Sequence, residues 1–391
     1  MTLDGATHPS LPPTTDVVVV GGGLAGTGVA WHLARAGRAV TLLERHDLNT
    51  EASGSNSGSI HAQIPAEPFA TYGEAWTRTF APTIRLLAHS ITLWRDLGAE
   101  LGSDLEVDTP GGLIVAATEA DMAGLAAKAA VERAHGLEVH LLDRASLHAM
   151  APYVAPRMIG GAFCPVEGKA NPLRATPALA AAARAAGAVI ATHTRLDAIE
   201  VLPSGGFRVA TSRGTITCRQ LVNCAGAEAG TIARMVGLDL PIEAHPIQSS
   251  VTEPTAPLVK HLLYAAGVAL SLKQTRLGHV LIGGGWPARL DRHSGRPVTN
   301  MASLVGNMRV ALSVVPAIGA LQVVRSWAAI VNGTADWKPL LGEAPRVPGF
   351  FLAFFPWMGF SAGPAVAASV AALVLGRDPG IDLGPFLISG R

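Results

Sequence analysis

The chain has 391 residues and carries 30 Lys and Arg against 29 Asp and Glu. This length exceeds the range over which one hydrophobic core keeps growing, so we expect two domains or one domain with a large insertion. Because the net charge is close to zero and no Lys/Arg run occurs, nucleic acid and anionic membranes are excluded as expected partners. The three cysteines form no CxxC pair, and they predict neither a disulfide framework nor a metal or iron–sulfur site.

The two ends of the chain show no targeting or membrane signal. Residues 1–15 are polar and rich in Pro and Thr, and we interpret them as an N-terminal arm rather than a secretory signal. The apolar run 364–375 is too short to cross a bilayer core of about 30 Å as a helix. This run is expected to form a buried helix, and the protein is expected in a reducing cytoplasm.

The N-terminal part predicts one βαβ unit. Residues 16–20 are a β-branched run, which is typical of a central parallel strand. Small and apolar residues recur at helical spacing over 24–36, and Gly37 ends this helix. A second strand is predicted over 39–44.

The rest of the chain mixes predicted helices and strands. Helical periodicity covers 75–101, 119–135 and 176–186, and strands are predicted over 112–116, 189–192, 207–211, 215–218 and 221–224. The last three strands are interpreted as a meander with a first turn at 204–206. This order predicts a nucleotide-binding domain that is interrupted by a second domain.

A glycine motif lies between the first strand and its helix. Gly21, Gly23 and Gly26 form GxGxxG, where the absent side chains allow a tight turn and let the helix N-terminus face a pyrophosphate. Glu44 ends the second strand, where a carboxylate can accept hydrogen bonds from a ribose diol. A mere tight turn is the alternative, but the order of strand, glycines, helix, strand and acid favours a dinucleotide site.

Small residues and hydroxyls fill the segment 51–59, EASGSNSGS. Its backbone N–H groups can approach a second phosphate or a flavin ring closely. On composition alone, a flexible loop is the alternative.

Four sequence blocks follow one another in a specific order. They are the GxGxxG unit with Glu44-Arg45 and the run 52–58; the run 221–226; the segments 325–328, 334–336 and 339–342; and the turn 357–365. Together these blocks, which span nearly the whole chain, resemble the D-amino acid oxidase-like superfamily of FAD-dependent oxidoreductases.

The resemblance implies an α/β fold. Its FAD-binding Rossmann-like domain has a parallel sheet and a β-meander, and an α+β substrate domain with a mixed, largely antiparallel sheet interrupts it. Residues 16–85, 150–228 and 320–391 would form the FAD-binding domain, and residues 86–149 and 229–319 the substrate domain.

The resemblance also implies non-covalently bound FAD. The residues expected to bind it are Gly21, Gly23, Gly26, Glu44, Arg45, Ser53, Ser55, Asn56, Ser57, Gly58, Leu196, Ala225, Gly226, Gly342, Gly359, Phe360 and Ser361.

Some positions set the chain apart within the superfamily. The runs 164–172, 272–274 and 281–287 look most like the flavin subunits of opine oxidase, hydrogen cyanide synthase and D-hydroxyproline dehydrogenase. Glu228 stands where the family has an aromatic residue, and Met358 stands where it has a histidine. The run 329–331 replaces a second arginine of glycine oxidase-like members, which leaves the carboxylate anchor open.

In this interpretation the flavin carries the redox chemistry and the protein orients the substrate. An uncharged amine can lose hydride without a strong base, so no general base is assigned.

A substrate carboxylate requires a cation, and Arg325 is the first candidate because its guanidinium can form a bidentate clamp; a structural ion pair is the alternative. Lys273 and Arg276 are further candidates, and His61 is expected either to face the flavin and substrate or to bond a backbone carbonyl. The tryptophans expected in the pocket wall, or else in the core, are Trp286, Trp327 and Trp357.

We therefore expect FAD-dependent oxidation of the C–N bond of a small carboxylate-bearing amine, to an imine that can hydrolyse. The substrate could be a D-amino acid, an opine, a hydroxyproline or a glycine-like compound. The alternatives are a self-sufficient sarcosine or glycine oxidase that makes hydrogen peroxide, and a non-catalytic flavin subunit. An NAD-linked dehydrogenase is disfavoured because no second GxGxxG occurs.

The electron acceptor is predicted to be another chain. Monomeric sarcosine oxidases carry an oxygen-activating lysine on a strand near the flavin, and the segment 280–287, taken as its counterpart, contains no lysine. We therefore expect a hetero-oligomer whose partner subunits hold further redox centres. The complex is expected in the cytoplasm, or at the periphery of the inner membrane through these partners.

Overall fold

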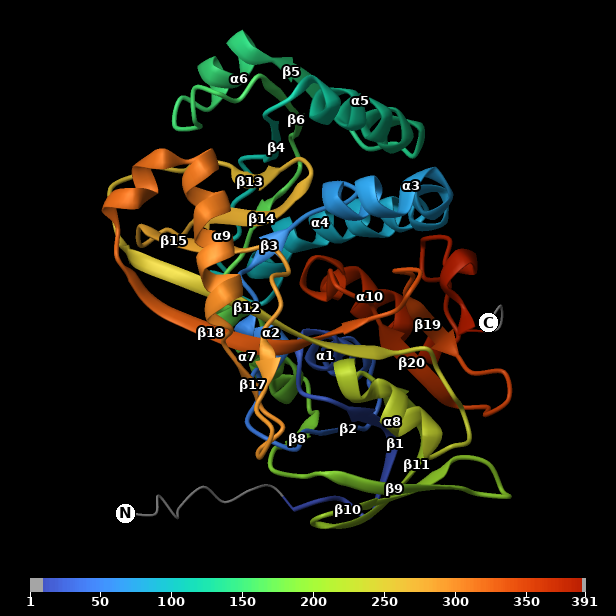
Figure 1. Ribbon diagram of the computed structural model, residues 1–391. Helices are drawn as coiled ribbons and strands as arrows, with labels where there is room; N and C mark the ends of the chain where they lie inside the picture. Colours follow the sequence, from blue (N-terminus) through green and yellow to red (C-terminus); the bar gives the residue numbers. More distant parts are fainter. Residues whose placement is uncertain (1–9, 389–391) are drawn as a thin grey trace, which may run out of the picture.

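The computed structural model describes residues 10–388, and two eight-stranded sheets form its framework (Figure 1). The first sheet has the order β19–β20–β11–β1–β2–β8, with the meander strands β10 and β9 attached beside β11. Its strands are β1 (Thr14–Val20), β2 (Val40–Leu43), β8 (Val189–Ala191), β9 (Leu196–Val201), β10 (Phe207–Thr211), β11 (Gly214–Asn223), β19 (Leu340–Glu343) and β20 (Phe350–Phe354).

The central strand β1 explains why the first sheet needs cover on both faces. It pairs in parallel with β11 on one side and with β2 on the other. Val17 and Val19 belong to one hydrophobic cluster, whereas Val18 and Val20 belong to a second cluster on the opposite face. The β-branched run is therefore continuous because both alternating faces are buried.

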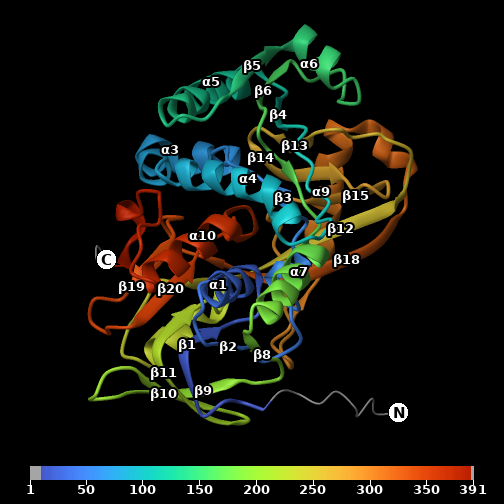
Figure 2. The same ribbon diagram turned by 180° about the vertical axis from the view of Figure 1, so that it is seen from behind.

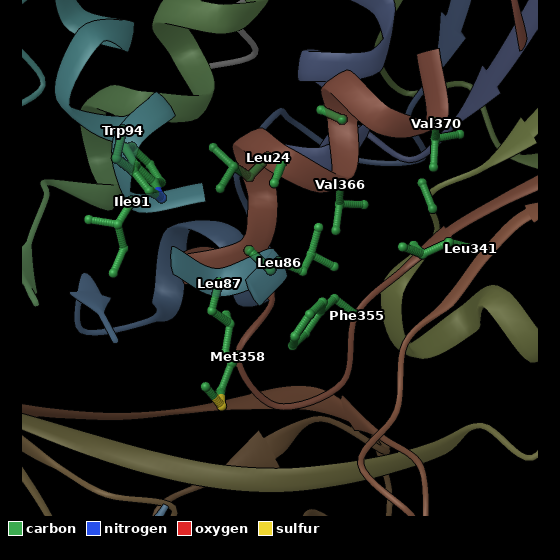
Figure 3. Packing of buried hydrophobic residues seen from close by; sticks show 14 of the residues in the cluster. Leu24, Leu86, Leu87, Ile91, Trp94, Leu341, Phe355, Met358, Val366 and Val370 are labelled. Atoms are coloured by element: carbon green, nitrogen blue, oxygen red, sulfur yellow. The ribbon is translucent and has the colours of Figure 1, made fainter. Parts of the chain in front are cut away.

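Four helices build the cluster on one face of this sheet. They are α1 (Leu24–Arg35), α4 (Thr83–Glu100), α7 (Pro172–Ala185) and α10 (Gly359–Val374). Helix α1 packs against α10 and also against α7, which lies beside it when the molecule is seen from behind (Figure 2). Gly28 permits this close approach, since a Cβ there would lie 2.7 Å from the side chain of Ala367 on α10. Figure 3 shows side chains of α1, α4 and α10 filling the space between these helices.

The second sheet has the order β18–β12–β15–β14–β13–β4–β6–β5. Its neighbours are antiparallel except for the parallel pair β13 and β4. Its strands are β4 (Gly112–Ala116), β5 (His140–Asp143), β6 (Gly160–Cys164), β12 (Glu243–Pro254), β13 (Leu262–Ala265), β14 (Val268–Gln274), β15 (His279–Gly283) and β18 (Val323–Gly333).

Short elements and further helices complete the chain. The helices are α2 (Ala52–Ser55), α3 (Ala66–Phe80), α5 (Glu119–Ala134), α6 (Arg144–Met150), α8 (Ala229–Arg234) and α9 (Met301–Val314), and the two-stranded pairs are β3 (Ser59–Ile60) with β7 (Gly168–Lys169) and β16 (Arg289–Leu290) with β17 (Pro297–Val298). Within residues 10–388, no helix is long and apolar enough to cross a membrane.

These two sheets confirm the expected fold class, and most of the expected elements lie within a few residues of their predicted ranges. Two predictions were wrong. The helix expected over 75–101 is two helices, because the chain breaks between α3 and α4 at residues 81–82, where Pro82 precedes α4. The strands expected over 215–218 and 221–224 are one strand, β11, and the turn 204–206 joins β10 to the strand β9, which was not predicted.

Sheet membership also differs from the expected division of the chain. Strands β6 and β18 lie in the second sheet, although both were expected in the FAD-binding domain. Helix α4 packs against α10, although most of it was expected in the substrate domain. Strand β1 begins at Thr14, inside the arm expected over residues 1–15, and residues 1–9 of that arm lie outside the described residues.

A fully buried ion pair joins α5 to the segment that follows β3. Lys128 Nζ lies 2.6 Å from Glu132 Oε1, and both side chains have no exposed surface. The same oxygen accepts a hydrogen bond of 2.7 Å from the backbone N–H of Ile64. Burial raises the pKa of the Glu132 carboxyl, and the adjacent Lys128 opposes this rise.

Removing the Lys128 side-chain charge should therefore destabilise the folded protein. Lys128→Met is expected to lower the free energy of unfolding by about 3–5 kcal/mol, because it leaves a buried carboxylate without its cation. The loss should grow as the pH rises above the ordinary pKa of a glutamate, since only the unfolded state then releases the proton readily. Urea unfolding at two pH values measures both effects.

The double variant Lys128→Met/Glu132→Leu is the matched control. It removes both charges, so it should recover much of the stability that the single variant loses. A single variant that is destabilised no more than the double variant at every pH would contradict this account.

Candidate active site

The glycine turn between β1 and α1 can only be formed by glycines. Gly21 has a φ of +108°, and a Cβ there would lie 2.6 Å from the carbonyl oxygen of Cys224. A Cβ on Gly26 would lie 1.9 Å from the carbonyl oxygen of Gly21. Helix α1 starts after Gly23, which has no side chain to cap it, and it has no acid in its first turn. The positive end of its dipole is thus available to a pyrophosphate.

Glu44 follows β2 and lies directly beside this turn. Its Oε2 accepts a hydrogen bond of 2.7 Å from the N–H of Gly22, and its Oε1 accepts one of 2.8 Å from the N–H of His46. These bonds fix the carboxylate at the carboxyl end of the strand. The neighbouring Arg45 is exposed and pairs with Glu51 and Glu228.

The segment 51–59 is an ordered turn rather than the alternative of an extended flexible loop. Residues 52–55 form α2, and Ser53 Oγ accepts a hydrogen bond of 2.9 Å from the N–H of Leu24 at the start of α1. Asn56 ties the segment together, because its Nδ2 donates to the carbonyl of Ser53 and its Oδ1 accepts from the N–H of Gly58. A Cβ on Gly58 would lie 2.2 Å from a backbone oxygen, which explains the glycine there.

A cavity of about 890 Å³ begins at this segment and extends along the second sheet. The predicted site residues that it brings together are Ser55, Asn56, Ser57, His61, Phe360 and Ser361. Ser361, near the start of α10, accepts a hydrogen bond from the N–H of His61 and donates one of 3.0 Å to the carbonyl of Ser59. Segments from both ends of the chain therefore meet at the cavity floor.

The remaining residues expected to bind FAD lie away from this lining. Ala225 and Gly226 follow β11 next to the glycine turn, where the Cα of Ala225 is 3.2 Å from the Cβ position of Gly21. Gly359 begins α10. Leu196 is buried in the core at the start of β9, and Gly342 lies within β19.

The three cations expected to anchor a carboxylate all lie outside the cavity lining. Arg325 is exposed near the start of β18, and its guanidinium lies 5.9 Å from the ring centre of Trp327. Arg276 is also exposed, and it pairs with Asp104. Lys273 is buried beneath the serine segment, where it donates to Ser57 and Ser59. Among the described residues, no lysine or arginine lines the cavity.

His61 and Tyr264 form a neutral polar pair at the cavity wall. Their rings are stacked with centres 6.1 Å apart and an interplanar angle of 10°. Burial lowers the pKa of His61 to about 3, with a further contribution from Lys273, so the ring is neutral. Burial also raises the pKa of Tyr264, and its buried hydroxyl has no hydrogen-bond partner within residues 10–388.

Aromatic side chains form much of the opposite wall. Trp286, Trp327 and Trp357, which were expected there, all line the cavity. The indole of Trp327 donates to the carbonyl of Ser55 over 2.7 Å, which ties this wall to the serine segment. Trp357 stacks on Trp337 with ring centres 5.0 Å apart, and its ring centre lies 4.5 Å from that of His245.

Sequence reasoning did not identify Trp337, His245 or Tyr264 as site residues. Trp337 and Trp357 have φ angles of 61° and 58°, which are unusual for bulky residues and give no sequence signal of their own.

Replacing Glu44 should weaken cofactor binding. Glu44→Ala removes the carboxylate expected to hold the ribose of FAD and is expected to cost about 1–3 kcal/mol in binding free energy. Reconstitution of apoprotein with FAD, followed by flavin fluorescence, measures this loss. Glu100→Ala is the control, because it removes an exposed carboxylate that pairs with Arg35 at the other end of α1. Equal FAD affinity in both variants would contradict the ribose assignment.

Comparison with known proteins agrees with this geometry. A family model described as "FAD dependent oxidoreductase" matches residues 16–373. An opine oxidase subunit from Agrobacterium tumefaciens (strain Ach5) is 29% identical over 92% of this chain and 92% of its own length. The beta subunit of sarcosine oxidase from Rhizobium meliloti (strain 1021) is 25% identical over 95% of this chain and 87% of its own length.

A solved structure gives the same result for the fold. The crystal structure of glycine oxidase from Geobacillus kaustophilus matches with a TM-score of 0.85 and 26% sequence identity, over 96% of this chain and 99% of that chain. These matches confirm the resemblance found in the sequence. The chain therefore belongs to the FAD dependent oxidoreductase family, and FAD is its cofactor.

Proposed function

We propose that this enzyme oxidises the C–N bond of an amino acid or an N-substituted amino acid. The observation that carries this proposal is the cavity of about 890 Å³ that joins the serine segment to a wall containing His61, Tyr264 and several tryptophans. The similarity to opine oxidase, sarcosine oxidase and glycine oxidase sequences supports the same class of substrate.

The described residues fit FAD. The start of α1 has no side chain at Gly23 and no acid in its first turn, which suits a pyrophosphate. Glu44 lies beside it for the ribose, and the serine segment leads from there into the cavity. Bound non-covalently, FAD would accept the hydride from the carbon that bears the nitrogen. The resulting imine can hydrolyse to a carbonyl compound. The protein supplies the orientation of the substrate relative to the flavin.

Tyr264 is the proposed contact for the substrate carboxylate. No lysine or arginine of the described chain lines the cavity. Because Arg325 is exposed outside the cavity, its position does not favour the expected bidentate clamp. Tyr264 lines the cavity, and its hydroxyl is a buried donor that lacks a partner within residues 10–388. Such a group costs free energy until a ligand accepts its hydrogen bond.

Tyr264→Phe should therefore weaken substrate binding without lowering the stability of the fold. We expect the apparent KM for a carboxylate-bearing amine to rise at least about tenfold, because the ligand loses a hydrogen bond to a charged group. Thermal stability should stay the same or rise, since the variant removes an unpaired buried hydroxyl. Tyr72→Phe is the control, because Tyr72 lines the same cavity but is 55% exposed. Equal KM values for both variants would contradict the proposed contact.

Electrons are proposed to leave through partner subunits. Two relatives, the opine oxidase subunit and the beta subunit of sarcosine oxidase, are by their names parts of larger assemblies. The three cysteines of this chain are buried and free, and no cluster of metal-binding side chains occurs in the described part of the chain. Further redox centres would thus be held by the partners, in a complex located in the cytoplasm or at the inner membrane.

Anaerobic reduction of the bound flavin tests the proposed function. A panel of D-amino acids, N-alkylglycines, hydroxyprolines and opines is mixed with the FAD-loaded protein, and the absorbance of oxidised flavin is followed. We expect at least one class to bleach the flavin completely. A flavin that stays oxidised with every amine, although dithionite reduces it, would identify a non-catalytic flavoprotein.

A further inference from the structure

Lys273 is a buried amine without an acidic partner within residues 10–388. Its side chain is 1% exposed on β14, and its Nζ donates to Ser57 Oγ over 2.8 Å and to Ser59 Oγ over 2.7 Å. Ser271 Oγ lies 3.4 Å away. No carboxylate within residues 10–388 forms an ion pair with this amine, whereas the other fully buried lysine, Lys128, pairs with Glu132. Three hydroxyls alone compensate a buried ammonium poorly.

The serines place this amine directly behind the cavity surface. Ser57 and Ser59 both line the cavity, and they belong to the segment that leads from the start of α1 to the cavity floor. Only the hydroxyl groups of these two serines therefore separate the Lys273 amine from the cavity. Its position on the sheet is directly opposite Leu281 of β15. The segment 280–287 has no lysine of its own, but a neighbouring strand supplies one at the same place.

The surroundings of this amine bring its pKa close to neutral pH, where its charged and uncharged forms are both populated. Burial, with a smaller contribution from the charge of Lys169, lowers the pKa of Lys273 to about 7. The titratable group that acts on it is Lys169, and Lys273 itself adds to the effect of burial in lowering the pKa of the neighbouring His61. A small change of nearby negative charge is thus enough to change the protonation of Lys273 near neutral pH.

We propose that Lys273 compensates the negative charge that two-electron reduction adds to the flavin, acting through the hydroxyls of Ser57 and Ser59. Binding a proton on Nζ when the electrons arrive would stabilise the reduced cofactor and raise its reduction potential. In this role Lys273 acts on the flavin through the two serines, as a positioning residue rather than a catalytic one. The proposal rests on FAD binding alone and is independent of which amine is the substrate.

The reduction potential of the bound FAD tests the proposal without any substrate. Lys273→Met is expected to make reduction of the flavin at least tenfold less favourable at pH 7, which corresponds to a potential about 30 mV lower for a two-electron couple. Sulfite, which adds reversibly to oxidised flavin and gives it negative charge, should bind at least tenfold more weakly. Dye-linked photoreduction and absorbance titration measure the two quantities.

Two controls separate charge from structure. Lys273→Arg carries a positive charge at every accessible pH, so its potential and its sulfite affinity should be equal to or higher than those of the wild type. Arg276→Met removes a charge from the exposed end of the same hairpin and should change neither quantity. Wild-type potential and sulfite affinity in Lys273→Met would overturn the proposal, whether or not any amine reduces the flavin.

A second variant covers the case in which Lys273→Met fails to hold FAD. Ser57→Ala/Ser59→Ala removes both hydroxyls and leaves the lysine in place. Its potential and its sulfite affinity should both fall, in the same direction as expected for Lys273→Met. If neither quantity changes in this double variant, Lys273 does not act through the serine segment and the proposal fails.

Discussion

The close approach of backbone to backbone at the glycine turn determines where everything else in the site lies. A Cβ on Gly26 would lie 1.9 Å from the carbonyl oxygen of Gly21, and a Cβ on Gly21 would lie 2.6 Å from that of Cys224. These contacts fix the start of α1 against the carboxyl ends of β1 and β11. Because Leu24 at that helix start donates to Ser53, the position of the serine segment depends on the same turn.

The serine segment then transmits this position to the rest of the molecule. Ser59 pairs with Lys169 in the β3–β7 ladder and accepts a hydrogen bond from Ser361 of α10. Its hydroxyl also contacts Lys273 of the second sheet. One short segment thus connects the first sheet, the C-terminal helix and the substrate side of the cavity. This connection explains why the cavity forms where segments distant in the sequence meet.

Local signals in the sequence were enough for the cofactor half of the site. The turn at Gly21, the strand before it and the carboxylate of Glu44 lie within one βαβ unit, so their spacing predicts their geometry. The substrate half was predicted only in part. His61 was expected, whereas Tyr264 and Trp337 were not, because their places in the cavity wall depend on long-range packing of both sheets. Arg325 shows the same limit: its side chain made it a candidate for the carboxylate clamp, but its sequence block did not reveal that it is exposed near the start of β18. Lys273 was not predicted as a flavin-side charge, because it comes from β14 rather than from the neighbouring strand over 280–287.

The central claim is that this site breaks a C–H bond at a carbon that bears nitrogen, and one anaerobic turnover tests it most directly. The FAD-loaded protein is mixed with an amine that reduces it, and the products are quantified by mass spectrometry against the amount of flavin reduced. The account predicts one equivalent of the imine, or of the carbonyl compound formed by its hydrolysis, for each flavin. Reduced flavin accompanied by a product that is oxidised at another position, with its amine carbon intact, would contradict it.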